Sequence, residues 1–173
     1  MKSLRGMRPQ DIAVLLKIIS LNKTPWKTTD LASQLYISQS EVSQALHRNW
    51  SAGLIDDSKK SVHKRSLIEF LVHGVQYVYP EKPGPIVRGT PTAHSAPPLS
   101  KMIELNGNVY VWPDEEGTAR GETIHPLYPS IPKAATVDPG FYELLALVDA
   151  IRVGRPREVK IAADELQKRI LAQ

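Results

Sequence analysis

Residues Thr28–Arg48 have the sequence TTDLASQLYISQSEVSQALHR, and the fold predicted for the first third of the chain depends on this stretch. Apolar side chains recur in it at helical spacing, which predicts two short amphipathic helices joined by a tight turn. The first is expected to run from Thr28, as N-cap, to about Tyr36. The second is expected to begin at Ser38, which has the capping-box spacing to Glu41. Two amphipathic helices joined this tightly are typical of a helix-turn-helix motif.

Further helices are expected on either side of this stretch. The segment Ile12–Ile19 carries apolar residues at positions i, i+3, i+4 and i+7, and Pro9 suits its first turn. The same kind of pattern predicts a helix from about Val62 to Val78. In the helix after Ser38, the predicted buried stripe comprises Val42, Ala45, Leu46 and, at its end, Trp50. The first third of the chain is therefore expected to be helical.

The Thr28–Arg48 stretch resembles the helix-turn-helix of bacterial winged-helix transcriptional regulators, the MarR-like group. The family pattern is close to L-A-x-x-L-G-[LIV]-S-x-[SP]-x-V-S-x-x-[LI], and the resemblance covers about residues 9–65. Tyr36 stands where the family usually has Gly, at a position that often needs a left-handed backbone. This departure predicts an opened turn or an extended helix. The resemblance also implies a short β-hairpin wing, with Asp56–Lys60 as its turn.

The resemblance further implies that the helix beginning near Gln39 enters the major groove of double-stranded DNA. The side chains expected to contact bases point away from the buried stripe, and they are Gln39, Ser40, Ser43, Gln44 and His47. The residues expected to contact phosphates are Thr28, Thr29, Arg48, Lys59, Lys60, Lys64 and Arg65. The alternative is a helical bundle that docks a protein, such as an antitoxin or a defence-operon partner protein.

The charge distribution favours a polyanionic partner. The 173 residues carry a formal net charge of +4, but residues 1–65 hold 11 Lys and Arg against 5 Asp and Glu. Residues 66–173 hold 11 against 13. A basic first third on a slightly acidic remainder is typical of a nucleic-acid-binding segment, whereas the alternative is an ordinary solvated surface.

Proline divides the chain. Eleven of the 14 prolines lie between Pro80 and Pro139, so long helices are excluded there. We therefore expect a helix-turn-helix domain over residues 1–79, a proline-rich connection over 80–100, and a small dimerisation or sensing domain over 101–173. The predicted fold class is mainly α with a small β component.

The last segment is expected to contain a β-hairpin and a helical hairpin. Asn108–Trp112 and Ala119–Ile124 have the alternation of strands, separated by a turn. Asp138 followed by Pro139 predicts the start of a helix that stops at Gly154, and a last helix follows. The corner between these helices carries a candidate anion or partner site of three arginines, Arg152, Arg155 and Arg157. The alternative is that Arg152 compensates the C-terminal end of its helix, while the other two arginines pair with Glu158 or Asp149.

Several function classes are not expected. The chain has no Cys, so disulfides, Cys-ligated zinc and thiol nucleophiles are excluded. Its five His are scattered, and no nucleotide-binding or nucleophile-elbow motif occurs, so we expect no metal, no cofactor and no enzymatic activity. No stretch approaches the roughly 20 apolar residues of a membrane span, and a cytoplasmic location is expected. The leading hypothesis is a sequence-specific, homodimeric DNA-binding transcriptional regulator.

Overall fold

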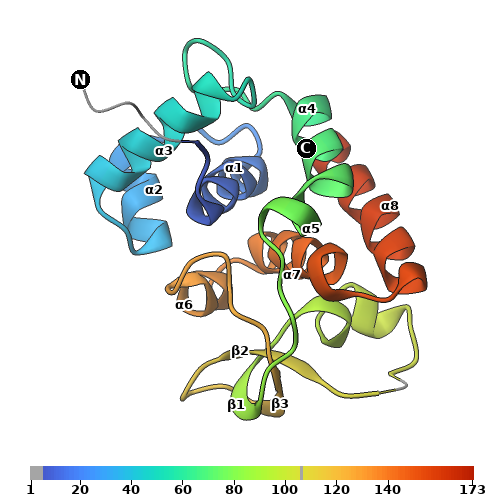
Figure 1. Ribbon diagram of the computed structural model, residues 1–173. Helices are drawn as coiled ribbons and strands as arrows, with labels where there is room; N and C mark the ends of the chain where they lie inside the picture. The colour runs from blue at the N-terminus through green and yellow to red at the C-terminus, as the bar shows by residue number, and fades with distance from the viewer. Residues whose placement is uncertain (1–5, 106) are drawn as a thin grey trace.

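A computed structural model describes residues 6–105 and 107–173, so the first five residues of the predicted N-terminal domain lie outside the described residues. The fold is mainly helical with one small three-stranded sheet, as the sequence predicts (Figure 1). The helices are α1 (Pro9–Leu21), α2 (Thr28–Leu35), α3 (Gln39–Ser51), α4 (Lys64–His73), α5 (Val75–Val78), α6 (Ile131–Thr136), α7 (Pro139–Val153) and α8 (Pro156–Ala172). The strands are β1 (Ile86–Pro91), β2 (Tyr110–Pro113) and β3 (Ala119–Thr123). Among the described helices, none combines the length and apolar character needed to cross a bilayer.

Helix α1 is the central helix of the N-terminal half. Every residue from Asp11 to Ile19 is buried, including the polar positions between the apolar ones. Helices α2 and α3 pack on α1, and α7 packs on it as well. A helix that is covered on all sides must be apolar nearly all round, and the Ile-Ala-Val-Leu-Leu run after Asp11 satisfies this. The core therefore surrounds α1 and does not stop at its predicted inner face.

Helix α2 differs from the sequence prediction at both of its ends. Lys27 is the N-cap, and its backbone N–H donates to the Asp30 carboxylate at 2.7 Å, so Thr28 is the first helical residue. Tyr36 adopts the left-handed conformation, with φ 55° and ψ 42°. The Ile37 N–H donates to the Ala32 carbonyl at 3.1 Å, which completes a Schellman-type helix end. The expectation of an opened turn is wrong, because Tyr36 takes the conformation that Gly usually supplies.

The two strands predicted as a β-hairpin do not pair as one. β2 and β3 run parallel, with Tyr110 opposite Glu122, and each pairs antiparallel with β1 to close a small barrel. A Cβ on Gly117 would lie 2.1 Å from the Gly89 carbonyl carbon, so the connection between β2 and β3 crosses directly over β1. The local pattern indicated two strands and a turn, but the third strand lies in the proline-rich segment and changes how they pair.

The proline-rich segment is part of the folded body. It contributes β1 and two short 3-10 helices, Ala93–Ser95 (η1) and Leu99–Lys101 (η2). Ala93, Ala96 and Leu99 are fully buried. Proline excludes long helices, but it permits a short strand and single helical turns between its positions, and these are what form. The expected connection over residues 80–100 is therefore itself a packed part of the fold.

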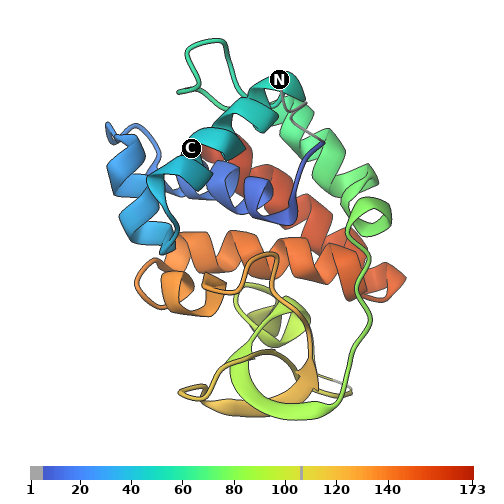
Figure 2. The ribbon, with the colours of Figure 1, turned by 60° about the vertical axis from the view of Figure 1, so that its left-hand side comes forward.

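Helix α7 lies between the helical half and the barrel. It contacts α1 and α5 as well as α8 and η1, and the two views in Figures 1 and 2 both show it crossing the molecule above the barrel. The predicted helical hairpin is formed by α7 and α8, which are joined at Gly154 and Arg155. The buried apolar side chains of the front helices, the barrel and this hairpin belong to one continuous cluster.

Candidate nucleic-acid interface

Helix α3 presents a polar face to the outside of the molecule. The Ser38 hydroxyl accepts the Glu41 N–H at 3.1 Å, which fixes the start of the helix. The apolar stripe of α3 is buried against α1 and α2, so the opposite face is left to solvent. The exposed side chains of this face are Gln39, Ser40, Ser43 and Gln44. All four of the predicted base-contacting side chains in the first two turns are thus brought together on one surface.

The C-terminal half of α3 departs from the prediction. Trp50 is 41% exposed, and its indole N–H donates to the Asp57 carboxylate at 2.8 Å. Asn49 takes the buried position instead and donates its side-chain amide to the Asp11 carbonyl at 3.0 Å. A 100° helical step places residue 49, and not residue 50, in line with the inner stripe at this point.

Arg48 does not lie on the predicted DNA surface. Its side chain is buried, and its guanidinium donates two hydrogen bonds of 2.7 Å to the two oxygens of the Asp11 carboxylate. These bonds raise the pKa of Arg48 above its ordinary value, so its guanidinium stays charged. The assignment of Arg48 as a phosphate contact is therefore wrong: Arg48 ties α3 to α1.

The loop after α3 is short and tightly closed. Ile55 and Val62 form a single antiparallel bridge, and no strand is assigned over these residues. The Asp56 carboxylate accepts the N–H groups of Lys60 and Ser61, both at 2.9 Å, and the Ser58 hydroxyl at 2.6 Å. The bond from Ser58, followed by those from the backbone, lowers the pKa of Asp56 to about 2, so this carboxylate stays ionised. Asp56 thus holds the loop in one conformation.

This loop places two lysines beside aromatic rings at the edge of the α3 face. The Lys59 ammonium lies 3.4 Å from His47 Nδ1 and 5.6 Å from the centre of the Trp50 ring. The Lys60 ammonium lies 3.8 Å from the centre of the Trp26 ring and donates to the Trp26 carbonyl at 3.1 Å. Stacking on a ring holds a flexible ammonium in place without neutralising it. Lys59 is thus brought next to His47, one of the base-contacting candidates, and Lys60 is held against Trp26, just before α2.

The remaining predicted phosphate contacts lie at the starts of two other helices. Thr28 and Thr29 begin α2, where Thr29 is exposed and Thr28 half-buried. Lys64 and Arg65 begin α4, and Arg65 is exposed. The Lys64 ammonium donates to the Gln173 carbonyl, so it is already engaged within the chain.

Residues far along the chain hold the α2–α3 turn in place. The Ser130 hydroxyl donates to the Leu35 carbonyl at 2.5 Å, and the Tyr128 hydroxyl donates to the Tyr36 carbonyl at 3.2 Å. The Lys133 ammonium lies 4.2 Å from the centre of the Tyr36 ring. These three residues were not predicted from the sequence, because nothing in their local pattern shows that they face a turn more than 90 positions earlier. They offset the cost, about 1–2 kcal/mol, of a left-handed Tyr.

The three arginines at the α7–α8 corner do not converge on one open site. Arg152 is directed inward, where it donates to Asp149 and to the Tyr79 carbonyl, both at 2.9 Å. Arg155 and Arg157 are exposed. The predicted anion site is therefore wrong for Arg152. The alternative expected carboxylate partners for the other two arginines, but it is Arg152 that pairs with Asp149. Burial raises the pKa of Asp149, and Arg152 opposes this shift.

Comparison with protein-family models, curated proteins and solved structures finds no significant match for this chain. Within the part of the chain that the structure describes, His, Asp and Glu side chains form no group of three that could hold a metal ion.

Proposed function

We propose that the protein is a sequence-specific DNA-binding transcriptional regulator that inserts α3 into the major groove. The observation that carries this proposal is the α3 face itself, with Gln39, Ser40, Ser43 and Gln44 exposed, and the Lys59–Lys60 loop beside His47 and Trp50 in the C-terminal half of the same helix. Glutamine and serine side chains match the donor and acceptor pattern of base edges in the major groove. Lysines at the edge of such a face supply the phosphate contacts that position it.

The arrangement of α2, α3 and the following loop supports a winged helix-turn-helix. The left-handed turn at Tyr36 and the cap at Ser38 fix the angle between α2 and α3. The Leu54–His63 loop, closed by its bridge, follows α3 in the chain, which is the order expected of a wing and a recognition helix. Asp56 and Asp57 also lie in this loop, where their carboxylates accept hydrogen bonds from the loop and from Trp50.

A homodimer is part of this proposal. Two copies of α3 would then contact half-sites about one helical turn of DNA apart, which corresponds to ~34 Å. The expected binding sequence is palindromic, and the expected stoichiometry is two chains per duplex.

The experiment begins with selection from a library of randomised duplexes, which we expect to enrich a palindromic motif. Fluorescence anisotropy then compares this motif with a scrambled duplex at two salt concentrations. We expect the motif to bind at least about 10³-fold more tightly than the scrambled duplex at physiological salt. Equal affinity for both would contradict the proposal, and a stoichiometric protein partner would then favour the alternative of a protein-binding module.

Two variants separate base contacts from phosphate contacts. Gln39→Ala with Gln44→Ala is expected to relax sequence preference by about 1–3 kcal/mol for each glutamine that pairs with a base. Lys59→Gln with Lys60→Gln is expected to weaken all duplexes alike and to reduce the salt slope by about 2 in total.

Matched controls lie on α8, away from α3 (Figure 1). Gln167→Ala and Lys160→Gln remove an exposed amide and an exposed ammonium there, and neither is expected to change specificity or salt slope. If these controls weaken binding as much as the α3 and loop variants do, α3 is not the DNA-reading element.

A further inference from the structure

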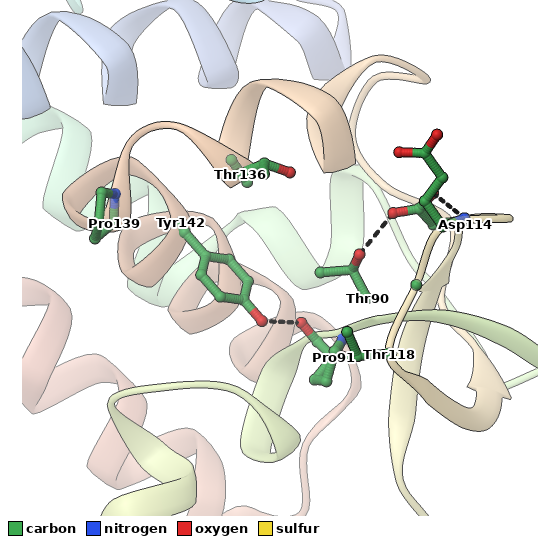
Figure 3. Close-up of a pocket in the computed structure, with 10 residues that line it drawn as sticks. Thr90, Pro91, Asp114, Thr118, Thr136, Pro139 and Tyr142 are labelled. Carbon is green, nitrogen blue, oxygen red and sulfur yellow. Dashed lines mark hydrogen bonds between the residues drawn. The ribbon is translucent and has the colours of Figure 1, made fainter.

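A cavity lies between the β-barrel and the two helices that cover it. Its volume is about 420 Å³, and its lining comes from β1, the β2–β3 connection, α6 and α7. Figure 3 shows Thr90, Pro91, Asp114 and Thr118 from the barrel together with Thr136, Pro139 and Tyr142 from the helices. Pockets of this size accept small organic molecules. The cavity is separate from the α3 face, and the proposed DNA contacts do not use any residue that lines it.

One wall of the cavity is apolar and rigid. Tyr142 donates its hydroxyl to the Pro91 carbonyl at 2.6 Å, so its ring is fixed and its polar end is occupied. Burial raises the pKa of Tyr142 to about 12, so the phenol stays neutral. Pro139 and the buried Ala135 continue this wall. A flat apolar body therefore has a surface to pack on.

The ionisable side chains that line the cavity are all acidic. Asp114 and Glu116 are the ionisable carboxylic acids of its lining, which contains no Lys, Arg or His. Within residues 6–105 and 107–173, neither carboxylate forms an ion pair, although the buried carboxylates of Asp11 on α1 and Asp149 on α7 do. The cavity thus offers negative charge that is not paired with a cationic side chain of the described residues within 4 Å.

The carboxylate of Asp114 has a fixed orientation and can accept further hydrogen bonds. Its Oδ2 accepts the Thr90 hydroxyl at 2.8 Å, and its Oδ1 accepts the Glu116 N–H at 3.1 Å. Each carboxylate oxygen has two lone-pair positions, so one position on each oxygen remains for a ligand. These internal bonds fix the orientation of the carboxylate. A planar, bidentate cation can therefore bind it without first ordering the side chain.

We propose that this cavity binds a small organic cation, an amidinium or amine on an apolar body, with Asp114 as its counter-charge. The apolar wall of Tyr142, Pro139 and Ala135 packs against the body of the ligand, and the carboxylate pairs with its cationic head. The threonine hydroxyls at the rim add neutral hydrogen-bonding groups. An anion of the same shape is rejected, because it meets two carboxylates.

The test uses three ligands of one shape: benzamidine, benzamide and benzoate. Each is titrated into the full chain without DNA, and binding is followed by amide chemical shifts in a two-dimensional NMR spectrum. We expect benzamidine to cause saturable shifts at Thr90, Thr118 and Thr136, with benzamide about tenfold weaker and benzoate not binding. Equal affinity for benzamide, or no saturable shift with benzamidine, overturns the proposal. Because no DNA is present, this result is independent of the proposed DNA-binding function.

Three variants complete the test. Asp114→Asn is expected to weaken benzamidine at least about tenfold, whereas Glu115→Gln, which removes a neighbouring exposed charge outside the cavity, is expected to have no effect. Thr118→Met fills the cavity from an exposed position and leaves both carboxylates in place, so it is expected to weaken benzamidine even if Asp114→Asn does not fold. If Glu115→Gln weakens binding as much as Asp114→Asn, the cation is attracted by surface charge alone and the site is not in the cavity.

Discussion

At the scale of single residues, the pair of Asp11 and Arg48 shows how a basic residue can leave a predicted surface. Arg48 follows His47 on α3, and its charge alone suggests a phosphate contact. In the structure, α1 places a carboxylate 2.7 Å from its guanidinium, and that carboxylate also accepts the Arg8 N–H at 2.8 Å. Because the carboxylate and the guanidinium are buried and bind each other, neither group is available to contact a phosphate.

We predict that Arg48→Met lowers the free energy of unfolding by about 3–5 kcal/mol, because it leaves the Asp11 carboxylate buried and uncompensated. Chemical denaturation followed by circular dichroism measures this loss. The double variant Asp11→Leu with Arg48→Met removes both charges, and it is expected to recover most of the stability. A loss below about 1 kcal/mol in the single variant would show that Arg48 is not a structural partner of Asp11.

At the scale of elements, the α2–α3 turn depends on a distant segment. Helix α2 ends with a Tyr in the left-handed conformation, and its last carbonyls accept bonds from Ser130 and Tyr128. The last carbonyls of a helix have no intrahelical partner, so external donors stabilise them. The angle between α2 and α3 is thus set partly by the segment that leads into α6.

We predict that Ser130→Ala lowers the free energy of unfolding by about 1 kcal/mol through loss of its bond to the Leu35 carbonyl. The amide protons of Tyr36 and Ile37 are expected to exchange faster, which hydrogen-exchange NMR detects at those two positions. Ser33→Ala is the control, because this exposed serine lies on α2 and makes no hydrogen bond through its side chain in the described chain. Unchanged exchange at the turn in Ser130→Ala would contradict the role assigned to Ser130.

At the scale of the whole molecule, α7 joins the halves of the chain. The Lys17 ammonium of α1 binds the carboxylate of Asp138, the N-cap of α7, at 2.6 Å. On the barrel side of α7, the Asp149 carboxylate accepts the Trp112 indole N–H at 2.6 Å and the Thr92 hydroxyl at 2.8 Å. Polar contacts on both sides of α7 accompany the continuous apolar core.

We therefore predict that the full chain unfolds in one cooperative transition, with coincident midpoints by circular dichroism and tryptophan fluorescence. Residues 1–79 alone are expected to show no cooperative transition, because they expose the face of α1 that α7 covers. Mixing residues 1–79 with residues 80–173 is the control, and it is expected to restore helical signal. A sigmoidal transition of the isolated segment 1–79 would contradict this prediction and support an independent domain.

Local sequence patterns were enough to predict the helices within Thr28–Arg48, the cap at Ser38, the polar face of α3 and the α7–α8 hairpin. These features follow from periodicity and capping, which act between residues a few positions apart. The same patterns placed the base-contacting candidates on one surface. Their role in DNA recognition stays a proposal.

Three other features depend on tertiary packing and could not be predicted from the sequence. Arg48 is buried because it pairs with Asp11. Strands β2 and β3 run parallel because each pairs with β1. The left-handed turn at Tyr36, which the local sequence disfavours, is stabilised by hydrogen bonds from Tyr128 and Ser130. The cavity beside Asp114 likewise exists only where the barrel meets α6 and α7. In each case the partner group lies tens of residues away along the chain, and only packing brings it within hydrogen-bonding distance.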